Sequence, residues 1–205
     1  MGRAGRGPNW TPANVVTCTR VVLMPLWLLV AELAVPAEGA ALSTSALASA
    51  ILFMALSLTD KLDGYLARSR NEVTTFGKFL DPIADKLLVV VALCYLLEHG
   101  WVAAWMVLLV VAREFLVSGL RMVVASKGVV VAASNLGKWK TATTMVALSG
   151  LLLTMCLPAA GGGLATVRLV LTVLSTIALY LAMFFTAWSG IDYFVKCWGY
   201  LGDEG

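Results

Sequence analysis

Charged residues are scarce in this chain. Only 13% of the 205 residues are Asp, Glu, Lys or Arg, whereas 60% are hydrophobic, and the mean hydropathy is +0.88. Soluble globular domains carry about 25% charged residues, so this composition excludes an ordinary soluble domain and predicts an integral membrane protein. The net charge is only +3, and we do not expect nucleic acid as a partner.

Histidine is nearly absent, and the cysteines form no motif. His99 is the only histidine, and Cys18, Cys94, Cys156 and Cys197 are widely spaced without a CxxC pair. This pattern supports neither a disulfide framework nor a Cys/His metal cluster, and it predicts thiols buried among apolar side chains. We interpret His99 as a solvated turn residue without a catalytic role.

Long apolar runs separated by short polar turns predict an all-α, polytopic membrane protein with six transmembrane helices. The expected spans are about 14–35, 42–66, 76–97, 101–125, 141–157 and 165–197. Residues 1–13 would form a basic interfacial segment, residues 14–198 a single six-helix domain and residues 199–205 a C-terminal tail. The sixth span exceeds the roughly 20 residues that cross the hydrocarbon, so it should tilt, bend or project beyond it.

Positive charges are distributed asymmetrically along this topology. With both termini in the cytoplasm, fourteen of the fifteen Lys and Arg residues, all except Arg168, lie on the cytoplasmic side or in the inward half of a span. The outer turns at 36–41, 98–100 and 158–164 contain no Lys or Arg. The positive-inside rule predicts this distribution. We therefore expect a multi-pass protein of the cell membrane whose polar site faces the cytoplasm.

Four aspartates lie between two long apolar runs. Asp60 and Asp63 are three residues apart, and Asp81 and Asp85 are four apart, so on helices each pair would lie on one face and the pairs would face each other across a hairpin. Partly desolvated carboxylates repel one another. Two divalent cations would cancel their charge, and ligation by oxygen alone favours Mg²⁺ or Mn²⁺ over zinc. The ordinary alternative is that the aspartates cap helices or pair with neighbouring lysines, namely Lys61, Lys78 and Lys86.

The segment around these aspartates resembles the signature of the CDP-alcohol phosphatidyltransferase family. It reads Asp60-x-x-Asp63-Gly64-x-x-Ala67-Arg68, then eight residues, then Gly77-x-x-x-Asp81-x-x-x-Asp85, and all eight fixed positions match. The resemblance implies a homodimeric transferase of phospholipid biosynthesis. It would use two metal ions, Mg²⁺ or Mn²⁺, and CDP-diacylglycerol as the lipid donor.

The resemblance also implies roles for single residues. Asp60, Asp63 and Asp81 would be metal ligands, and Asp85 would be the general base for the acceptor hydroxyl and would also touch a metal. Four further residues would border CDP-diacylglycerol, with the arginine near its phosphates: Gly64, Ala67, Arg68 and Gly77. The glycines and the alanine leave room for close approach to the backbone.

The first expected span opens with polar residues at every third position. Asn14, Thr17 and Arg20 share one face of a helix. Together with Pro25 they resemble the N-x-x-T-x-x-R-x-x-x-x-P opening of phosphatidylglycerophosphate synthases, which belong to this family. By this resemblance Asn14 and Thr17 would border CDP-diacylglycerol. An alternative explanation of Arg20 is that it snorkels to the membrane interface.

Residues 112–141, AREFLVSGLRMVVASKGVVVAASNLGKWKT, also resemble phosphatidylglycerophosphate synthases. Arg113, Glu114 and Arg121 interrupt the fourth expected span, and charges at this depth should face the bundle interior or an aqueous cavity. Arg113 and Glu114, as sequence neighbours, are not expected to pair within the helix. Lys138 and Lys140 fall in the stretch that we expect to connect the fourth and fifth spans.

Four basic residues near the cytoplasmic end are candidates to bind the phosphate of an acceptor: Arg113, Arg121, Lys138 and Lys140. The resemblance implies sn-glycerol 3-phosphate as acceptor, giving phosphatidylglycerophosphate and CMP. Inositol phosphate would also need a basic pocket, and serine and phosphatidylglycerol stay open as acceptors. Outside the enzymes, intramembrane carboxylates can mark a divalent-cation or proton transporter, although here the acids cluster at one interface.

Overall fold

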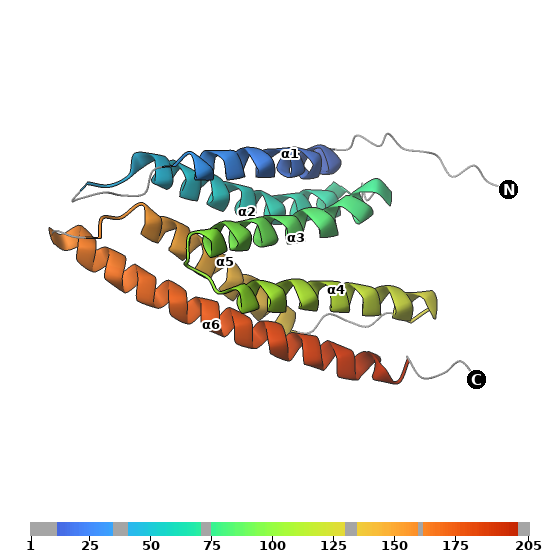
Figure 1. The fold of residues 1–205 in the computed structure, drawn as a ribbon. Coiled ribbons are helices and arrows are strands. Elements are labelled where there is room, and N and C mark those ends of the chain that lie inside the picture. Colours follow the sequence, from blue (N-terminus) through green and yellow to red (C-terminus); the bar gives the residue numbers. More distant parts are fainter. Residues whose placement is uncertain (1–11, 35–40, 71–74, 130–134, 160–161, 201–205) are drawn as a thin grey trace.

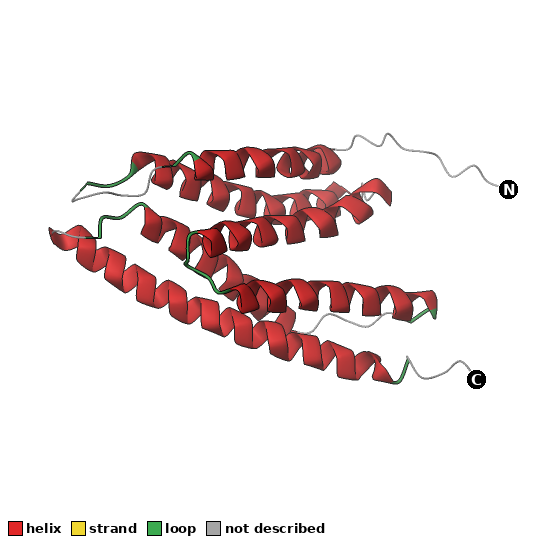
Figure 2. Cartoon of the chain, viewed as in Figure 1, coloured by secondary structure: helices red, strands yellow, loops and turns green. Residues whose placement is uncertain are grey.

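The computed structural model describes residues 12–34, 41–70, 75–129, 135–159 and 162–200 (Figure 1). For residues 12–16, 60–70, 75–82 and 85 it describes the backbone but not the side chains. Six helices and no strand occur in these ranges (Figure 2). The helices are α1 Pro12–Glu32, α2 Thr44–Arg70, α3 Thr75–Glu98, α4 Ala104–Ser126, α5 Asn135–Met155 and α6 Gly162–Trp198. The prediction of an all-α fold is confirmed.

Two glycines end helices α3 and α4 in the same way. Gly100 and Gly128 have φ of 73° and 76°, a left-handed conformation that glycine adopts without steric cost. Beyond them, the backbone N–H groups of Trp101 and Val129 donate to the carbonyls of Leu96 and Val124 at 2.8 and 3.3 Å. This closure satisfies carbonyl groups that would otherwise be left unpaired at the helix ends.

The helices pack as two connected groups. Helix α1 packs on α2 and α3, while α5 and α6 form an extensive pair. Helices α2 and α3 contact α5, and α4 lies against α6 and α3. In Figure 1, α2, α4 and α6 end at the right of the view, where α1 and α3 begin. The aspartate segment, where α2 ends and α3 begins, therefore belongs to one end of the bundle, whereas Arg113 lies in the middle of α4.

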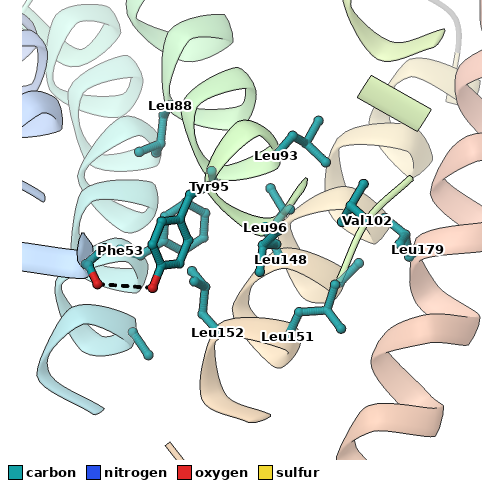
Figure 3. Packing of buried hydrophobic residues seen from close by; sticks show 14 of the residues in the cluster. Phe53, Leu88, Leu93, Tyr95, Leu96, Val102, Leu148, Leu151, Leu152 and Leu179 are labelled. Carbon is teal, nitrogen blue, oxygen red and sulfur yellow. Dashed lines mark hydrogen bonds between the residues drawn. The ribbon is translucent and has the colours of Figure 1, made fainter. Parts of the chain in front are cut away.

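Aromatic residues hold the first group of helices together. Trp27 of α1 packs against Phe53 of α2 and Tyr95 of α3, with ring centroids 5.4 and 5.9 Å apart. Figure 3 shows Phe53 and Tyr95 among the buried leucines of α3 and α5. The Trp27 indole donates to the Ser49 carbonyl at 3.0 Å, and the Tyr95 hydroxyl donates to the Ala31 carbonyl at 3.1 Å. Both rings thus bury apolar surface without leaving their polar atoms unpaired.

Helices α5 and α6 approach each other most closely at Gly150. A Cβ atom added there would overlap the Ser175 hydroxyl and would lie 3.0 Å from the Ser175 Cβ. Buried hydroxyls along the same two helices bond within their own helix, because Thr154 donates to the Gly150 carbonyl and Thr186 to the Ala182 carbonyl. Small residues and satisfied hydroxyls at helix contacts are typical of packing inside membranes.

The outer surface of the bundle carries many large apolar side chains. On α6 they recur along nearly the whole helix: Leu164, Val167, Leu169, Val170, Val173, Leu174, Ile177, Tyr180, Leu181, Phe184, Trp188, Ile191, Val195 and Trp198. Within the described residues, α6 is the one helix that is long and apolar enough to cross a membrane, judged by length and composition alone. The prediction of six spans therefore stays a prediction.

The structure corrects several details. Helix α2 continues to Arg70, beyond the expected end of the second span at residue 66, so Arg68 lies in a helix. Helix α5 begins at Asn135, so Lys138 and Lys140 lie in α5 and not in a connection. Polar residues end a membrane span, but they do not end a helix unless the backbone loses its hydrogen bonds. Cys156 and Cys197 are buried as predicted, whereas Cys94 is exposed, since it lies on the outer face of α3. The expected segments 1–13 and 199–205 lie largely outside the described residues.

We expect Gly150→Ala to lower the free energy of unfolding of the detergent-solubilised protein by about 1–3 kcal/mol, because α5 and α6 must separate or Ser175 must rotate. The matched control is Gly163→Ala, since nothing lies within 4 Å of a Cβ added at Gly163. Thermal midpoints of both variants and of Gly150→Ala/Ser175→Gly check the prediction. Equal midpoints for Gly150→Ala and Gly163→Ala, or failure of Ser175→Gly to restore stability, would contradict it.

Candidate functional site

The aspartate segment is helical on both sides of a short connection. Helix α2 carries Asp60 and Asp63 in its last turns, and α3 carries Asp81 and Asp85 in its first half. Figure 1 shows α2 ending and α3 beginning at the same end of the bundle. The backbone thus has the helical hairpin that the spacing predicted. The side chains of all four aspartates lie outside the described residues, as do those of Asn14, Gly64, Ala67, Arg68 and Gly77.

A buried ion cluster lies where α4 and α5 meet. The Glu114 carboxylate accepts a hydrogen bond from Arg113 NH1 at 3.0 Å and another from Lys140 Nζ, both on the same oxygen, Oε1. The three side chains are only 12–14% exposed. The prediction that charges within α4 face the bundle interior or an aqueous cavity is confirmed for Arg113 and Glu114, but it does not hold for Arg121, which is exposed. Pairing opposite charges in this way lowers the cost of removing them from water.

The expectation that Arg113 and Glu114 would not pair is wrong. Neighbouring residues on a helix point in different directions, which is why Cβ positions alone argue against contact. Both side chains are long, however, and each is only 14% exposed, so the two charged groups pair with each other at 3.0 Å. Burial, rather than helical spacing, decides this contact.

A second lysine, from α3, contacts α4 one helical turn beyond Glu114. Lys86, which follows Asp85 on α3, donates a hydrogen bond to the Ser118 hydroxyl. Ser118 lies four residues after Glu114, on the same face of the helix. Lys86 is thereby held on the face of α4 that also carries Glu114. We call the set Lys86, Arg113, Glu114 and Lys140 the cation cluster; it contains three cations and one carboxylate.

Helix α6 closes the cluster on the side of Arg113. A Cβ atom added at Gly190 would lie 3.2 Å from Arg113 Cγ, closer than an ordinary van der Waals contact, so the absence of a side chain at Gly190 gives the arginine its space. The Arg113 Nε atom is buried and has no hydrogen-bond partner among the described residues. One donor of this guanidinium is therefore uncommitted.

The other two predicted acceptor-phosphate residues lie outside the cation cluster. Arg121 is exposed, two helical turns after Arg113, and its guanidinium carbon is 5.9 Å from the centroid of the Tyr193 ring. Lys138 is exposed, with no ion-pair partner in the described part of the chain. The structure thus brings together Arg113 and Lys140 of the predicted set, and it adds Lys86 and Glu114.

The sequence carries partial signals for the added residues. Lys86 directly follows the last aspartate of the signature, a position that by itself suggests only an ion-pair partner of an aspartate. Glu114 and Ser118 are four residues apart, a spacing that places both on one face. Gly190 carried no such signal, because its importance depends on how closely α6 approaches α4.

On α1, Thr17 and Arg20 are almost completely buried, each 2% exposed. They share one face of the helix, as their spacing predicted. The alternative that Arg20 snorkels to the membrane interface is wrong, because a snorkelling guanidinium would reach water.

Two basic residues outside the cation cluster, Arg168 and Lys196, have local partners. Arg168 NH1 donates to the Leu157 carbonyl at 2.8 Å, and its guanidinium lies over the Trp101 ring. Lys196 pairs with Asp192, four residues earlier on α6, at 2.7 Å. His99 is exposed in the turn after α3, which confirms its expected position.

Comparison with known proteins relates the chain to one family. Residues 10–188 match the family model described as CDP-alcohol phosphatidyltransferase. A protein of Bacillus subtilis (strain 168) is 44% identical over 192 residues, covering 90% of this chain and 94% of the relative. A protein of Rickettsia bellii is 40% identical over 184 residues, covering 90% and 93%. One of Escherichia coli (strain K12) is 41% identical over 143 residues, covering 68% and 75%. Each relative is named CDP-diacylglycerol–glycerol-3-phosphate 3-phosphatidyltransferase.

Two buried tyrosines allow a matched test of the packing. The Tyr193 hydroxyl is buried without a partner among the described residues, whereas the Tyr95 hydroxyl donates to Ala31. We expect Tyr95→Phe to lower the free energy of unfolding by about 1 kcal/mol, and Tyr193→Phe to leave it unchanged or raise it. Thermal midpoints of the two variants in detergent check this. A larger loss for Tyr193→Phe than for Tyr95→Phe would be the contrary result.

Proposed function

The chain belongs to the CDP-alcohol phosphatidyltransferase family, and we propose that it transfers the phosphatidyl group of CDP-diacylglycerol to sn-glycerol 3-phosphate. The products would be phosphatidylglycerophosphate and CMP, a step of phospholipid biosynthesis. The observation that carries this proposal is the likeness to relatives bearing that name, 44% identical over 90% of the chain in one case. The likeness extends over both the aspartate segment and the cation cluster.

The aspartates supply the ligands that a divalent metal site needs. We infer that Asp60, Asp63 and Asp81, with Asp85 as a further ligand, hold two Mg²⁺ or Mn²⁺ ions, since hard cations prefer carboxylate oxygens. Helix α2 ends where α3 begins, at the same end of the bundle. This arrangement supports the inference, because the last turns of α2 and the first half of α3 carry all four residues. Such ions, when bound, neutralise pyrophosphate charge and polarise the phosphorus under attack.

The chain's own groups would then orient the reactants and move the proton. Asp85 would accept the proton of the acceptor hydroxyl while the oxygen of that hydroxyl forms a new bond to the phosphatidyl phosphorus. The bond from that phosphorus to CMP breaks in the same step, so no covalent enzyme intermediate is needed. Residues bordering CDP-diacylglycerol would fix its position: Gly64, Ala67, Arg68, Gly77, Asn14 and Thr17.

The cation cluster is suited to the phosphate of the acceptor. Arg113 and Lys140 are buried and fixed by Glu114, and guanidinium and ammonium groups are the usual ligands of phosphate. Arg121 and Lys138, which are exposed, would contribute to phosphate binding from the surface of α4 and α5. The cation cluster contains three cations and one carboxylate, so two positive charges have no counter-ion within it. Unpaired charges are costly inside an apolar bundle, so the cluster favours a phosphorylated acceptor over serine, which carries no phosphate.

A membrane location follows from the same features. Even the shorter helices, α1 and α5, have 21 residues, about 30 Å at 1.5 Å per residue, which matches the hydrocarbon thickness. We infer six spans in the cell membrane, with the catalytic end at the cytoplasmic face, where the lysines and arginines gather. A homodimer remains part of the proposal.

The proposal predicts CMP release with one acceptor. Membranes containing the wild-type chain, CDP-diacylglycerol and Mg²⁺ should release CMP with glycerol 3-phosphate and form phosphatidylglycerophosphate, and Asp85→Asn should abolish release. Inositol phosphate, serine and phosphatidylglycerol serve as parallel acceptors. Release only with another acceptor would replace the substrate assignment, whereas no release with any alcohol would favour a transporter.

Metal removal should separate the roles of the aspartates. Chelation should abolish CMP release, and Mg²⁺ or Mn²⁺ should restore it. Asp60→Asn, Asp63→Asn or Asp81→Asn should abolish both activity and Mn²⁺ binding, measured by electron paramagnetic resonance, because each removes a carboxylate ligand. Asp85→Asn should abolish activity while retaining part of the Mn²⁺ binding. Full Mn²⁺ binding by Asp60→Asn, or activity that survives chelation, would overturn the two-metal assignment.

A further inference from the structure

Glu114 is the one carboxylate in the cation cluster, and it has an unusual position there. A single oxygen, Oε1, accepts from Arg113 on its own helix and from Lys140 on α5. All three side chains are largely removed from solvent. An exposed ion pair holds its partners weakly, but in a buried one neither cation can leave the carboxylate without losing its compensation.

The same face of α4 orients the third cation. Ser118, one turn after Glu114, accepts the hydrogen bond of Lys86, and Lys86 sits next to Asp85 in the sequence of α3. Helix α4 therefore positions lysines from two different helices, with Arg113 between α4 and α6 close to Gly190. Through the contact of Lys86 with Ser118, helix α3, which carries Asp81 and Asp85, is connected to the helix that carries Arg113.

Charge balance indicates what the cluster is prepared to bind. Three cations and one carboxylate leave two uncompensated positive charges among the described side chains of the cluster. A phosphate monoester carries about −1.5 to −2 charges near neutral pH. The remaining charge thus matches one such dianion. Without Glu114 the site would hold three cations that repel each other, and a buried lysine without its counter-ion is destabilised in its charged form.

We propose that Glu114 is a positioning residue for the acceptor phosphate: it holds Arg113 and Lys140 at one point and leaves the cluster with the net charge of plus two that a phosphate monoester dianion neutralises. This inference rests on the proposed function. Glu114 does not itself contact the phosphate, since two anions would repel; it acts through the two cations. Arg113 retains an uncommitted buried donor, Nε, and a guanidinium can offer several donors to phosphate oxygens.

Steady-state kinetics of Glu114→Gln test the proposal. Glutamine keeps the size and one acceptor oxygen but removes the charge. We expect the KM for glycerol 3-phosphate to rise about tenfold or more, as for loss of a charge-assisted contact, while the KM for CDP-diacylglycerol changes less than about twofold. A purely structural role would lower the amount of active enzyme and leave both KM values unchanged.

Two further variants complete the experiment. Glu114→Asp keeps the charge on a shorter side chain, so the acceptor KM should lie between those of wild type and Glu114→Gln; if Glu114→Gln does not fold, this variant decides. Asp192→Asn breaks the exposed pair with Lys196 and should change none of the constants. Thermal midpoints measured without substrate report any loss of stability separately.

The outcomes are distinguishable from failure of the proposed function. If wild-type protein releases no CMP with glycerol 3-phosphate, the proposed function fails. If wild-type protein is active but both Glu114 variants keep the wild-type KM for glycerol 3-phosphate, the positioning role is overturned while the proposed function stands. An acceptor KM that falls in Glu114→Gln would also overturn it, because net positive charge alone would then control binding.

Discussion

The structure depends on compensating charge inside an apolar bundle. Helix α4 carries Arg113 and Glu114 in its middle, and neither could remain there ionised without a partner. Lys140 supplies the balance from α5, and both cations converge on one carboxylate oxygen. Because α4 otherwise packs chiefly on α6 and α3, this contact also ties it to α5. The same interaction thus serves the packing and prepares a site for an anion.

Close packing makes that arrangement possible. Gly190 leaves space for Arg113, and Gly150 lets α5 and α6 approach, so the helices that flank the cluster hold a defined distance. On the other side, Trp27, Phe53 and Tyr95 join α1, α2 and α3 through ring contacts and two hydrogen bonds to carbonyls. In the first region the Trp27 and Tyr95 polar atoms have partners, as an apolar surrounding requires, whereas the buried Arg113 Nε atom of the second has none among the described residues.

Much of this fold could be predicted from the sequence, because apolar runs and glycine turns determine where helices form. Helix ends were less predictable: Arg68 and Lys140 are polar enough to end a span, yet the helix continues through them. The snorkelling alternative for Arg20 and the expected separation of Arg113 from Glu114 are wrong for one reason, namely that local spacing does not reveal how deeply a side chain is buried. For Asp85 the spacing places the residue on its helix, and its chemistry still rests on the family.

The shared oxygen of Glu114 has a consequence for any dissection of this site. Arg113 and Lys140 do not contribute independent terms, since displacing one changes what the carboxylate offers to the other. Residues joined in this way show interaction energies that make their individual effects non-additive. A single substitution in the cluster therefore measures the response of the group, and only a thermodynamic cycle through paired substitutions can apportion that response between its members.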